Sequence, residues 1–123
     1  MAGDMTFGGS KFMQSISVSI SSSYTNYAYG IKNQGKITFE GDFTGKLTVT
    51  ATGNNNSFAC GIYNYKDLNG CDINIKRLSG AWNISSTGWA LAIQSAAALT
   101  IGEVASKITV TGKAQKAYAF EST

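Results

Sequence analysis

The segment YAYGI (residues 27–31) returns three times in altered form, as FACGI (58–62), WALAI (89–93) and KAYAF (116–120). Between the copies lie further segments such as KLTVT (46–50), in which apolar residues alternate with polar ones. Alternation over about five positions is typical of a β-strand. A strand unit that recurs at a regular spacing cannot bury its apolar face alone, so successive units must stack. The repeat therefore predicts a solenoid.

We predict an all-β fold: a single right-handed parallel β-solenoid (β-helix) of about four coils, with three short strands per coil and no helical cap. The alternative is an antiparallel sandwich, whose turns would also be rich in glycine and asparagine. A sandwich gives no reason for the same residue types to recur at the same coil positions, so we favour the solenoid. The expected domain covers 1–123 and divides into a partial coil (1–26), coils 27–57, 58–88 and 89–115, and a final strand (116–123).

The alternation also predicts which side chains face the interior. In the recurring segment we expect two inward columns, each with one residue from every copy. They are Ile31, Ile62, Ile93 and Phe120 in one column, and Tyr29, Cys60, Leu91 and Tyr118 in the other. The opposite positions carry only alanine and glycine, as in Ala59 and Gly61, and we expect them to form an outward stripe. Such a stripe is either a docking face or a face under little constraint.

The composition bounds the kind of protein. Hydrophobic residues make up 43% and charged residues 14% of the chain, which is typical of a folded domain. The net charge of +3 comes from scattered residues, so no surface for nucleic acid is expected. No apolar run is long enough for a transmembrane segment, and the first residues carry no signal-peptide pattern. This leaves an intracellular protein, a mature chain and an excised fragment as alternatives.

The titratable residues predict no catalytic site, metal site or cofactor. The sequence contains no histidine, and only Glu40 and Asp42 place two carboxylates close together, at a glycine turn. We interpret this pair as a solvated turn and expect no enzyme activity. Cys60 and Cys71 lack zinc-ligand spacing, and they either form a disulfide across one corner or remain two buried thiols.

The unit AYGI…ITFEGDFTGKLTVTATGNNNSFACGI (28–62) resembles the degenerate repeats in passenger regions of bacterial autotransporters and filamentous-adhesin-like surface proteins. The resemblance covers roughly 13–120 and consists of A-x-G-I, then I-x-I, then a glycine turn and I-x-V. Proteins of this family are right-handed parallel β-helices. The resemblance implies an extracellular or cell-surface location and a structural or adhesive role.

The first and last strands predict end-to-end self-assembly. Before the first complete coil lie Met5, Phe7, Phe12, Ile16 and Val18, and after the last one lie Ala117, Tyr118, Ala119 and Phe120. These leftover strands together make up one coil, so the last strand of one molecule can lie beside the first strands of the next. Such a head-to-tail contact does not close on itself and generates a filament. We therefore predict a self-assembling structural protein whose partner is itself.

An adhesin-type binding module is the alternative function, with a surface glycan or a host protein as partner. Loops on a scaffold tend to carry recognition. The candidate ligand residues are Asn54, Asn55, Asn56, Tyr63, Tyr65 and Asp67. A further alternative is an ice-binding solenoid, because Thr48 and Thr50 share coil positions with Thr109 and Thr111. The middle coil interrupts this rank with NIS (83–85), which argues against ice binding.

Overall fold

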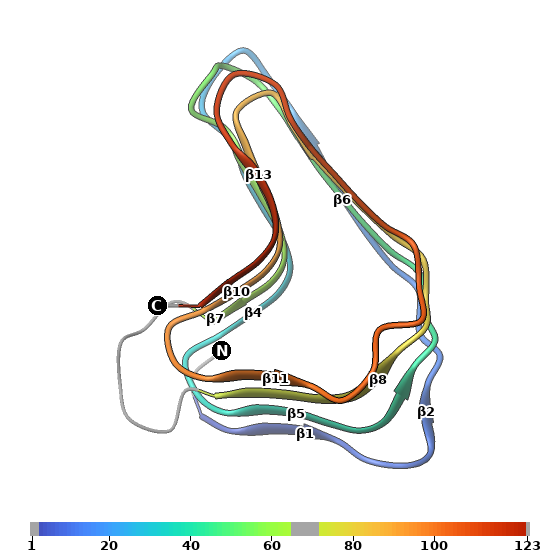
Figure 1. The fold of residues 1–123 in the computed structure, drawn as a ribbon. Helices are drawn as coiled ribbons and strands as arrows, with labels where there is room; N and C mark the ends of the chain where they lie inside the picture. Colours follow the sequence, from blue (N-terminus) through green and yellow to red (C-terminus); the bar gives the residue numbers. More distant parts are fainter. Residues whose placement is uncertain (1–2, 65–71, 123) are drawn as a thin grey trace.

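The computed structural model describes residues 3–64 and 72–122, which form a right-handed parallel β-solenoid (Figure 1). The chain makes about four turns, and each coil consists of three strands. The described residues contain no helix, and so none that is long and apolar enough to cross a membrane. The predicted fold class is confirmed.

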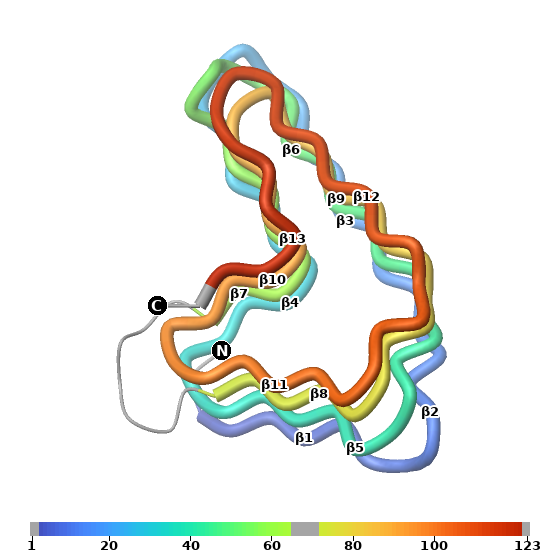
Figure 2. Tube along the Cα trace, in the orientation of Figure 1, coloured from blue at the N-terminus to red at the C-terminus, as the bar shows by residue number. Residues whose placement is uncertain are grey.

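Three parallel sheets form the sides of the coil, and each takes strands from successive coils. Sheet A comprises β1 (Met5–Phe7), β2 (Lys11–Phe12), β5 (Ile37–Phe43), β8 (Ile73–Leu78) and β11 (Leu99–Ile101). Sheet B comprises β3 (Ile16–Ser21), β6 (Leu47–Thr52), β9 (Trp82–Ser86) and β12 (Ile108–Gly112). Sheet C comprises β4 (Tyr27–Asn33), β7 (Phe58–Asn64), β10 (Trp89–Ser95) and β13 (Ala117–Ser122). Figure 2 shows that successive coils follow almost the same path around the axis.

The strand register reproduces the repeat seen in the sequence. Phe58 of β7 pairs with Tyr27 of β4 on one side and with Trp89 of β10 on the other. The first strands join the same scheme, since Met5 pairs with Ile37 in sheet A. Parallel in-register pairing therefore collects equivalent residues of each coil into columns along the axis.

Sheets A and B bury the side chains that the alternation predicts. Ile37, Leu47 and Ile84 are fully buried, and Trp82 of β9 is 1% exposed. The indole ring of Trp82 packs against the ring of Phe43, with 5.3 Å between the ring centroids. Each fully buried apolar side chain of this size contributes roughly 1.5–3 kcal/mol to the free energy of unfolding. The coils are held together by these columns and by the hydrogen bonds between equivalent strands.

Sheet C departs from the predicted alternation in the first half of each strand. Ala28, Ala59 and Ala90 are at most 2% exposed and belong to the core, whereas Tyr27 is 59% exposed. The expected outward stripe of alanine and glycine is therefore wrong, because it faces inward. In the expected inward column of Tyr29, Cys60, Leu91 and Tyr118, the residues Cys60 and Leu91 are buried, but Tyr29 and Leu91 line a groove on the outer side of the sheet. Tyr118, in register with Leu91, is 39% exposed on that side.

The physical reason is the narrow interior between sheets B and C. A Cβ atom on Gly61 would lie 3.0 Å from a methyl group of Leu47 and 3.3 Å from one of Ile84, so only a very small residue fits there. The alternation breaks at the next residue, because Ile62 is also fully buried in the core. The strands of sheet C bend along their length (Figure 2). In the second half of these strands Ile31, Ile62 and Ile93 face the core as predicted, while Phe120, in the last coil, is 39% exposed.

Candidate functional site

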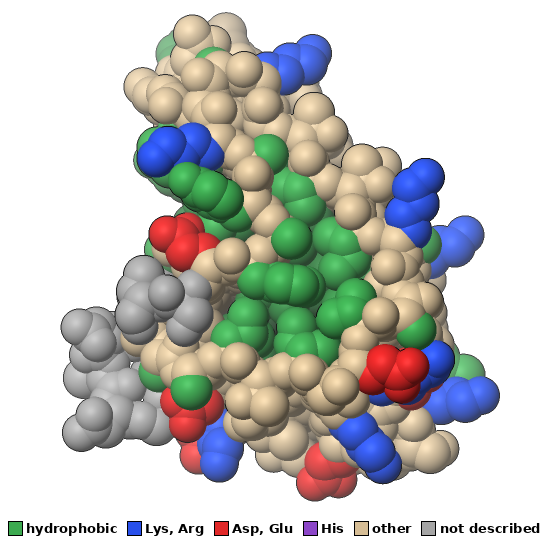
Figure 3. Space-filling view, in the orientation of Figure 1, with side chains coloured by type: hydrophobic (Ala, Val, Ile, Leu, Met, Phe, Trp, Pro, Cys, Tyr) green, Lys and Arg blue, Asp and Glu red, His purple; other side chains and the backbone are tan. Residues whose placement is uncertain are grey.

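The solenoid exposes part of its apolar interior at the end where the chain finishes, which we call the C-terminal end face. Its outermost strands are β11, β12 and β13. The apolar side chains that are half-buried or exposed there are Leu99, Ile101, Val104, Ile108, Val110 and Phe120. Figure 3 looks onto this end and shows apolar side chains gathered at its centre, with charged side chains around the rim.

The opposite end, the N-terminal end face, is formed by β1, β2, β3 and the outer edge of β4. Its half-buried apolar side chains are Met5, Phe7, Phe12, Ile16 and Val18. Met13 and Ile20 beside them are 70% and 40% exposed. Phe7 occupies the coil position that Ile101 occupies at the other end, through the pairs along sheet A. The two end faces therefore present apolar side chains at equivalent coil positions.

The predicted assembly residues all lie on outermost strands. Met5, Phe7, Phe12, Ile16 and Val18 belong to the N-terminal end face. Ala117, Tyr118, Ala119 and Phe120 lie in β13, and their side chains are exposed. An outermost strand of a sheet has one edge whose N–H and C=O groups pair with no further strand, which makes it a template for another strand.

A column of four charged residues crosses sheet A from the first coil to the last, near the C-terminal ends of its strands. Lys11, Asp42, Arg77 and Glu103 lie in successive coils, and their signs alternate. The Nη1 of Arg77 lies 2.6 Å from Oδ2 of Asp42, and its Nε lies 3.0 Å from Oε2 of Glu103. Glu103 lies beside Arg77 in the next coil because its backbone C=O accepts a hydrogen bond from the N–H of Leu78. We call this set the charge column.

Asp42 is the best-partnered carboxylate of the charge column. It accepts a hydrogen bond from Oγ of Ser79 at 2.8 Å in addition to the one from Arg77. Desolvation raises the pKa of Asp42, but the hydrogen bonds from Ser79 and Arg77 and the charges of Arg77 and Lys11 outweigh it. The net result is a pKa below the ordinary value, so the carboxylate stays ionised in the folded protein.

A second column on sheet C also begins with a lysine and ends with a glutamate. Lys32 pairs in register with Tyr63, Tyr63 with Gln94, and Gln94 with Glu121. The lysine belongs to the first strand of the sheet and the glutamate to the last. Both columns thus carry a positive charge toward the N-terminal end face and a negative charge toward the C-terminal end face.

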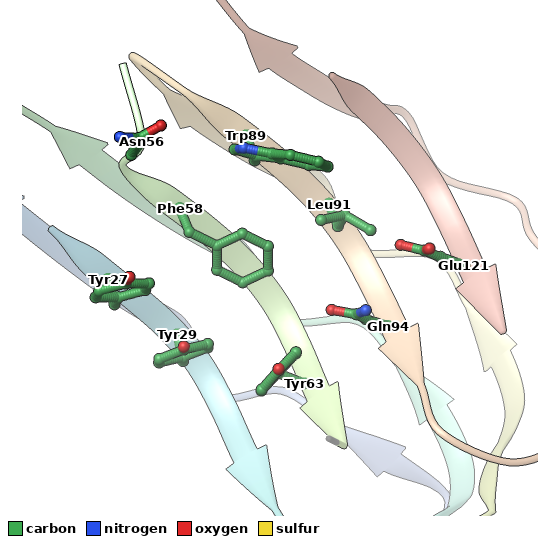
Figure 4. A pocket seen from close by; sticks show the side chains of 9 residues that line it. All are labelled: Tyr27, Tyr29, Asn56, Phe58, Tyr63, Trp89, Leu91, Gln94 and Glu121. Carbon is green, nitrogen blue, oxygen red and sulfur yellow. The ribbon is translucent and has the colours of Figure 1, made fainter. Parts of the chain in front are cut away.

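The outer side of sheet C carries a groove of about 370 Å³, which we call the aromatic groove (Figure 4). Aromatic and aliphatic side chains line most of it, and Asn56, Gln94 and Glu121 supply polar groups. The apolar lining consists of Tyr27, Tyr29, Phe58, Tyr63, Trp89 and Leu91. The groove exists because sheet C places these side chains outside and its alanines inside. Rings presented on a concave surface beside hydrogen-bonding groups are typical of ligand sites.

Two lysines flank the aromatic groove. Nζ of Lys32 lies 4.7 Å from the centroid of the Tyr29 ring, and Nζ of Lys116 lies 5.9 Å from the centroid of the Trp89 ring. Both distances are within the range of cation–π interactions. Cys60 pairs in register with Tyr29 and Leu91 and is fully buried, and burial raises the pKa of its thiol.

The structure separates the predicted ligand residues. Asn56 and Tyr63 line the aromatic groove. Asn54 is instead tied to the neighbouring coil, because its Nδ2 donates to Oγ1 of Thr25 at 2.7 Å. Asn55 is exposed and does not line the groove. The candidates Tyr65 and Asp67, and Cys71 as a disulfide partner, lie outside the described residues.

Sequence reasoning missed the charge column and the aromatic groove as units. The charge column had a signal, since each member directly precedes an apolar residue at one recurring coil position: Phe12, Phe43, Leu78 and Val104. The groove could not be predicted because the alternation predicts the wrong side-chain directions in the first half of each strand of sheet C.

In the described ranges 3–64 and 72–122, no group of three or more histidine, cysteine or acidic side chains is placed to hold a metal ion. Comparison with family models, curated proteins and solved structures finds no match. The class that the fold defines is a three-sided parallel β-solenoid with apolar end faces.

Proposed function

We propose that this protein is a non-enzymatic structural subunit that assembles head to tail into a filament or surface fibre. The observation that supports this most strongly is the match between the two end faces, which present apolar side chains at equivalent coil positions. Exposed apolar surface of this kind marks interaction sites in soluble proteins. The resemblance of the repeat to surface-fibre proteins is the reason to place the filament at the cell surface.

In this filament, every sheet continues from one subunit to the next. β13 of one subunit pairs with β4 of the following one, β11 with β1, and β12 with β3. The contact joins different surfaces of the two copies, so it propagates without closing. Coils about 4.8 Å apart give an axial repeat of about 19 Å for a four-coil subunit.

The direct test is electron microscopy of the purified protein with helical indexing of any fibres. Fibres with one subunit every 19 Å or so, as expected for four stacked coils, support the proposal. A stable monomer of 13.0 kDa in sedimentation velocity at high concentration, without fibres, would overturn it.

A pair of variants ties the assembly to the end faces. Val104 is 46% exposed on the C-terminal end face, and in the filament it faces Phe12 of the next subunit. Val104→Asp should keep the fold but prevent fibres, because the contact would bury a carboxylate against apolar side chains. The matched control is Thr48→Asp, an exposed position in the middle of sheet B, which should assemble like the parent. Equal assembly of both variants contradicts the proposal.

The aromatic groove favours an adhesin-type module as a second candidate function, with a neutral glycan as ligand. Sugar rings offer an apolar face edged by hydroxyl groups. The ring faces of Tyr27 and Trp89 can pack against the apolar face of a sugar. The side chains of Asn56, Gln94 and Glu121 can form hydrogen bonds with its hydroxyl groups. The groove runs across all four strands of sheet C, from Tyr27 to Glu121, which fits an extended chain better than a single compact ligand.

Tryptophan fluorescence tests this second candidate. Trp89 lines the groove, whereas Trp82 is buried in the core, so a bound sugar changes the emission of Trp89. We would titrate cello-, chito- and maltohexaose, and expect Tyr27→Ala to abolish the response. Tyr24→Ala, at a side chain 76% exposed outside the groove, is the control. No change with any of the three at millimolar concentration contradicts glycan binding.

A further inference from the structure

The charge column ends in opposite signs at the two end faces. Inside the molecule each charge has neighbours of opposite sign, as the two ion pairs of Arg77 with Asp42 and Glu103 show. Glu103 is the last member of the charge column among residues 3–64 and 72–122, and its side chain is 61% exposed. At the other end, Lys11 is exposed beside Asp42.

The register of sheet A fixes what would come next. Each coil adds one member to the charge column, and β1 and β2 of a second copy would follow β11. The position beyond Glu103 would then be taken by Lys11 of that copy. The alternation of signs would continue across the junction, with the lysine meeting the glutamate as Arg77 does inside the molecule.

The second column makes the same match on a different sheet. Glu121 lies in β13, the outermost strand of sheet C, in register with Gln94. If β4 of the next copy pairs with β13, its Lys32 takes the position beyond Glu121. Two pairs on two sides of the coil constrain rotation as well as position.

We infer that the pairs Glu103–Lys11 and Glu121–Lys32 between copies select the polarity and register of the junction. This rests on the proposed head-to-tail assembly and adds what makes it specific. Burial of apolar side chains is non-directional, so it would also tolerate end faces meeting head to head or rotated by one side. A contact between two C-terminal end faces brings glutamates together, and like charges placed against each other disfavour such a pairing.

Charge reversal with mixing tests the inference. Lys11→Glu gives a variant with carboxylates at both ends of the charge column, and Glu103→Lys gives one with ammonium groups at both ends. In the charge column, each variant alone makes only like-charge junctions, whereas a 1:1 mixture allows the two variants to alternate, so that every junction is matched. We expect the concentration needed for fibres to rise about tenfold or more for each variant alone, and the mixture to return to within about threefold of the parent.

Lys107→Glu is the control, since it makes the same charge change as Lys11→Glu but at a position of the C-terminal end face outside both columns. Lys107 lies in the coil position of Ser15, Lys46 and Ala81, where the next copy brings no charge. This variant should assemble like the parent. In 1 M salt the Debye length is about 3 Å, so the penalty of the single variants should shrink.

The outcomes separate the inference from the function on which it rests. If the parent forms no fibres, the proposed function fails and the inference fails with it. If the parent forms fibres and the single variants do so equally well, or mixing restores nothing, only the inference is overturned. Circular dichroism confirms that each variant is folded. Should Glu103→Lys unfold because it faces Arg77, the pair Lys32→Glu and Glu121→Lys gives the same test on sheet C.

Discussion

Arg77 and Asp42 form an ion pair between neighbouring coils, with Nη1 of the arginine 2.6 Å from Oδ2 of the aspartate. Backbone pairing places the two residues side by side in sheet A. The pair therefore joins two neighbouring coils on the outside of the solenoid. The side chain of Asp42 is 18% exposed.

This ion pair predicts how acid affects stability. The pKa of Asp42 is lowered in the folded protein, so its contribution is present above its unfolded pKa of about 3.9 and is lost as the pH falls through the lower folded value. We expect Asp42→Asn to lower the melting temperature at pH 7. The difference from the parent should disappear well below pH 3.

Asp4→Asn is the control for this experiment. Asp4 also accepts a hydrogen bond from the next coil, through Oδ1, from the N–H of Lys36, but no ion pair of the described residues includes it. An asparagine oxygen can accept the same hydrogen bond. A pH-independent loss of stability in Asp42→Asn would contradict the role assigned to its charge.

Ile62→Asp tests the core column. Ile62 is fully buried between two neighbouring coils, where Ile31 and Ile93 are its partners in register. The substitution removes roughly 1.5–3 kcal/mol of apolar burial and adds an unpartnered carboxylate, so we expect an unfolded or severely destabilised protein. Chemical denaturation followed by circular dichroism measures the loss. Thr48→Asp, exposed on sheet B, should change the free energy of unfolding by about 0.5 kcal/mol or less.

The buried thiol of Cys60 predicts slow chemical labelling. The residue is fully buried and burial raises the pKa of its thiol, so the reactive thiolate is scarce and inaccessible in the folded protein. In a Cys71→Ser background, we expect labelling on the order of a hundredfold or more slower than in urea, because it requires local opening. Rapid labelling of the folded protein would show that sheet C opens easily at the groove.

Sheets A and B could be predicted from the sequence because only every second residue of their strands is apolar, so only one face of each strand can turn to the core. In β6, for example, Leu47 and Val49 are buried while Thr48 between them is exposed, as the alternation requires. The register of the coils was also readable, since a repeated segment such as FACGI aligns with YAYGI without a gap.

Sheet C could not be predicted in the same way. Alternate positions in the first half of its strands carry either aromatic residues together with Cys60 and Leu91, or only alanine and glycine, and either set can face a core. The choice depends on the distance to the opposite sheet, which Leu47 and Ile84 set from a different part of the chain. Local alternation carries no information on that distance, nor on the irregularity by which the adjacent residues Gly61 and Ile62 both face inward.

Gly61→Ala tests whether this narrow interior determines the direction of the side chains in sheet C. A Cβ atom at this position would lie 2.5 Å from the backbone oxygen of Ala92 in the next coil and 3.0 Å from a methyl group of Leu47. Backbone cannot move away as a flexible side chain can, so we expect the substitution to cost roughly 1–3 kcal/mol of the free energy of unfolding. Gly8→Ala is the matched control, because its Cβ would meet only a carboxylate oxygen of Glu40 at 3.5 Å, an ordinary contact. Urea denaturation of both variants gives the comparison. If Gly61→Ala is as stable as Gly8→Ala, the interior has room for larger side chains, and a steric reason for the outward aromatic groove is wrong.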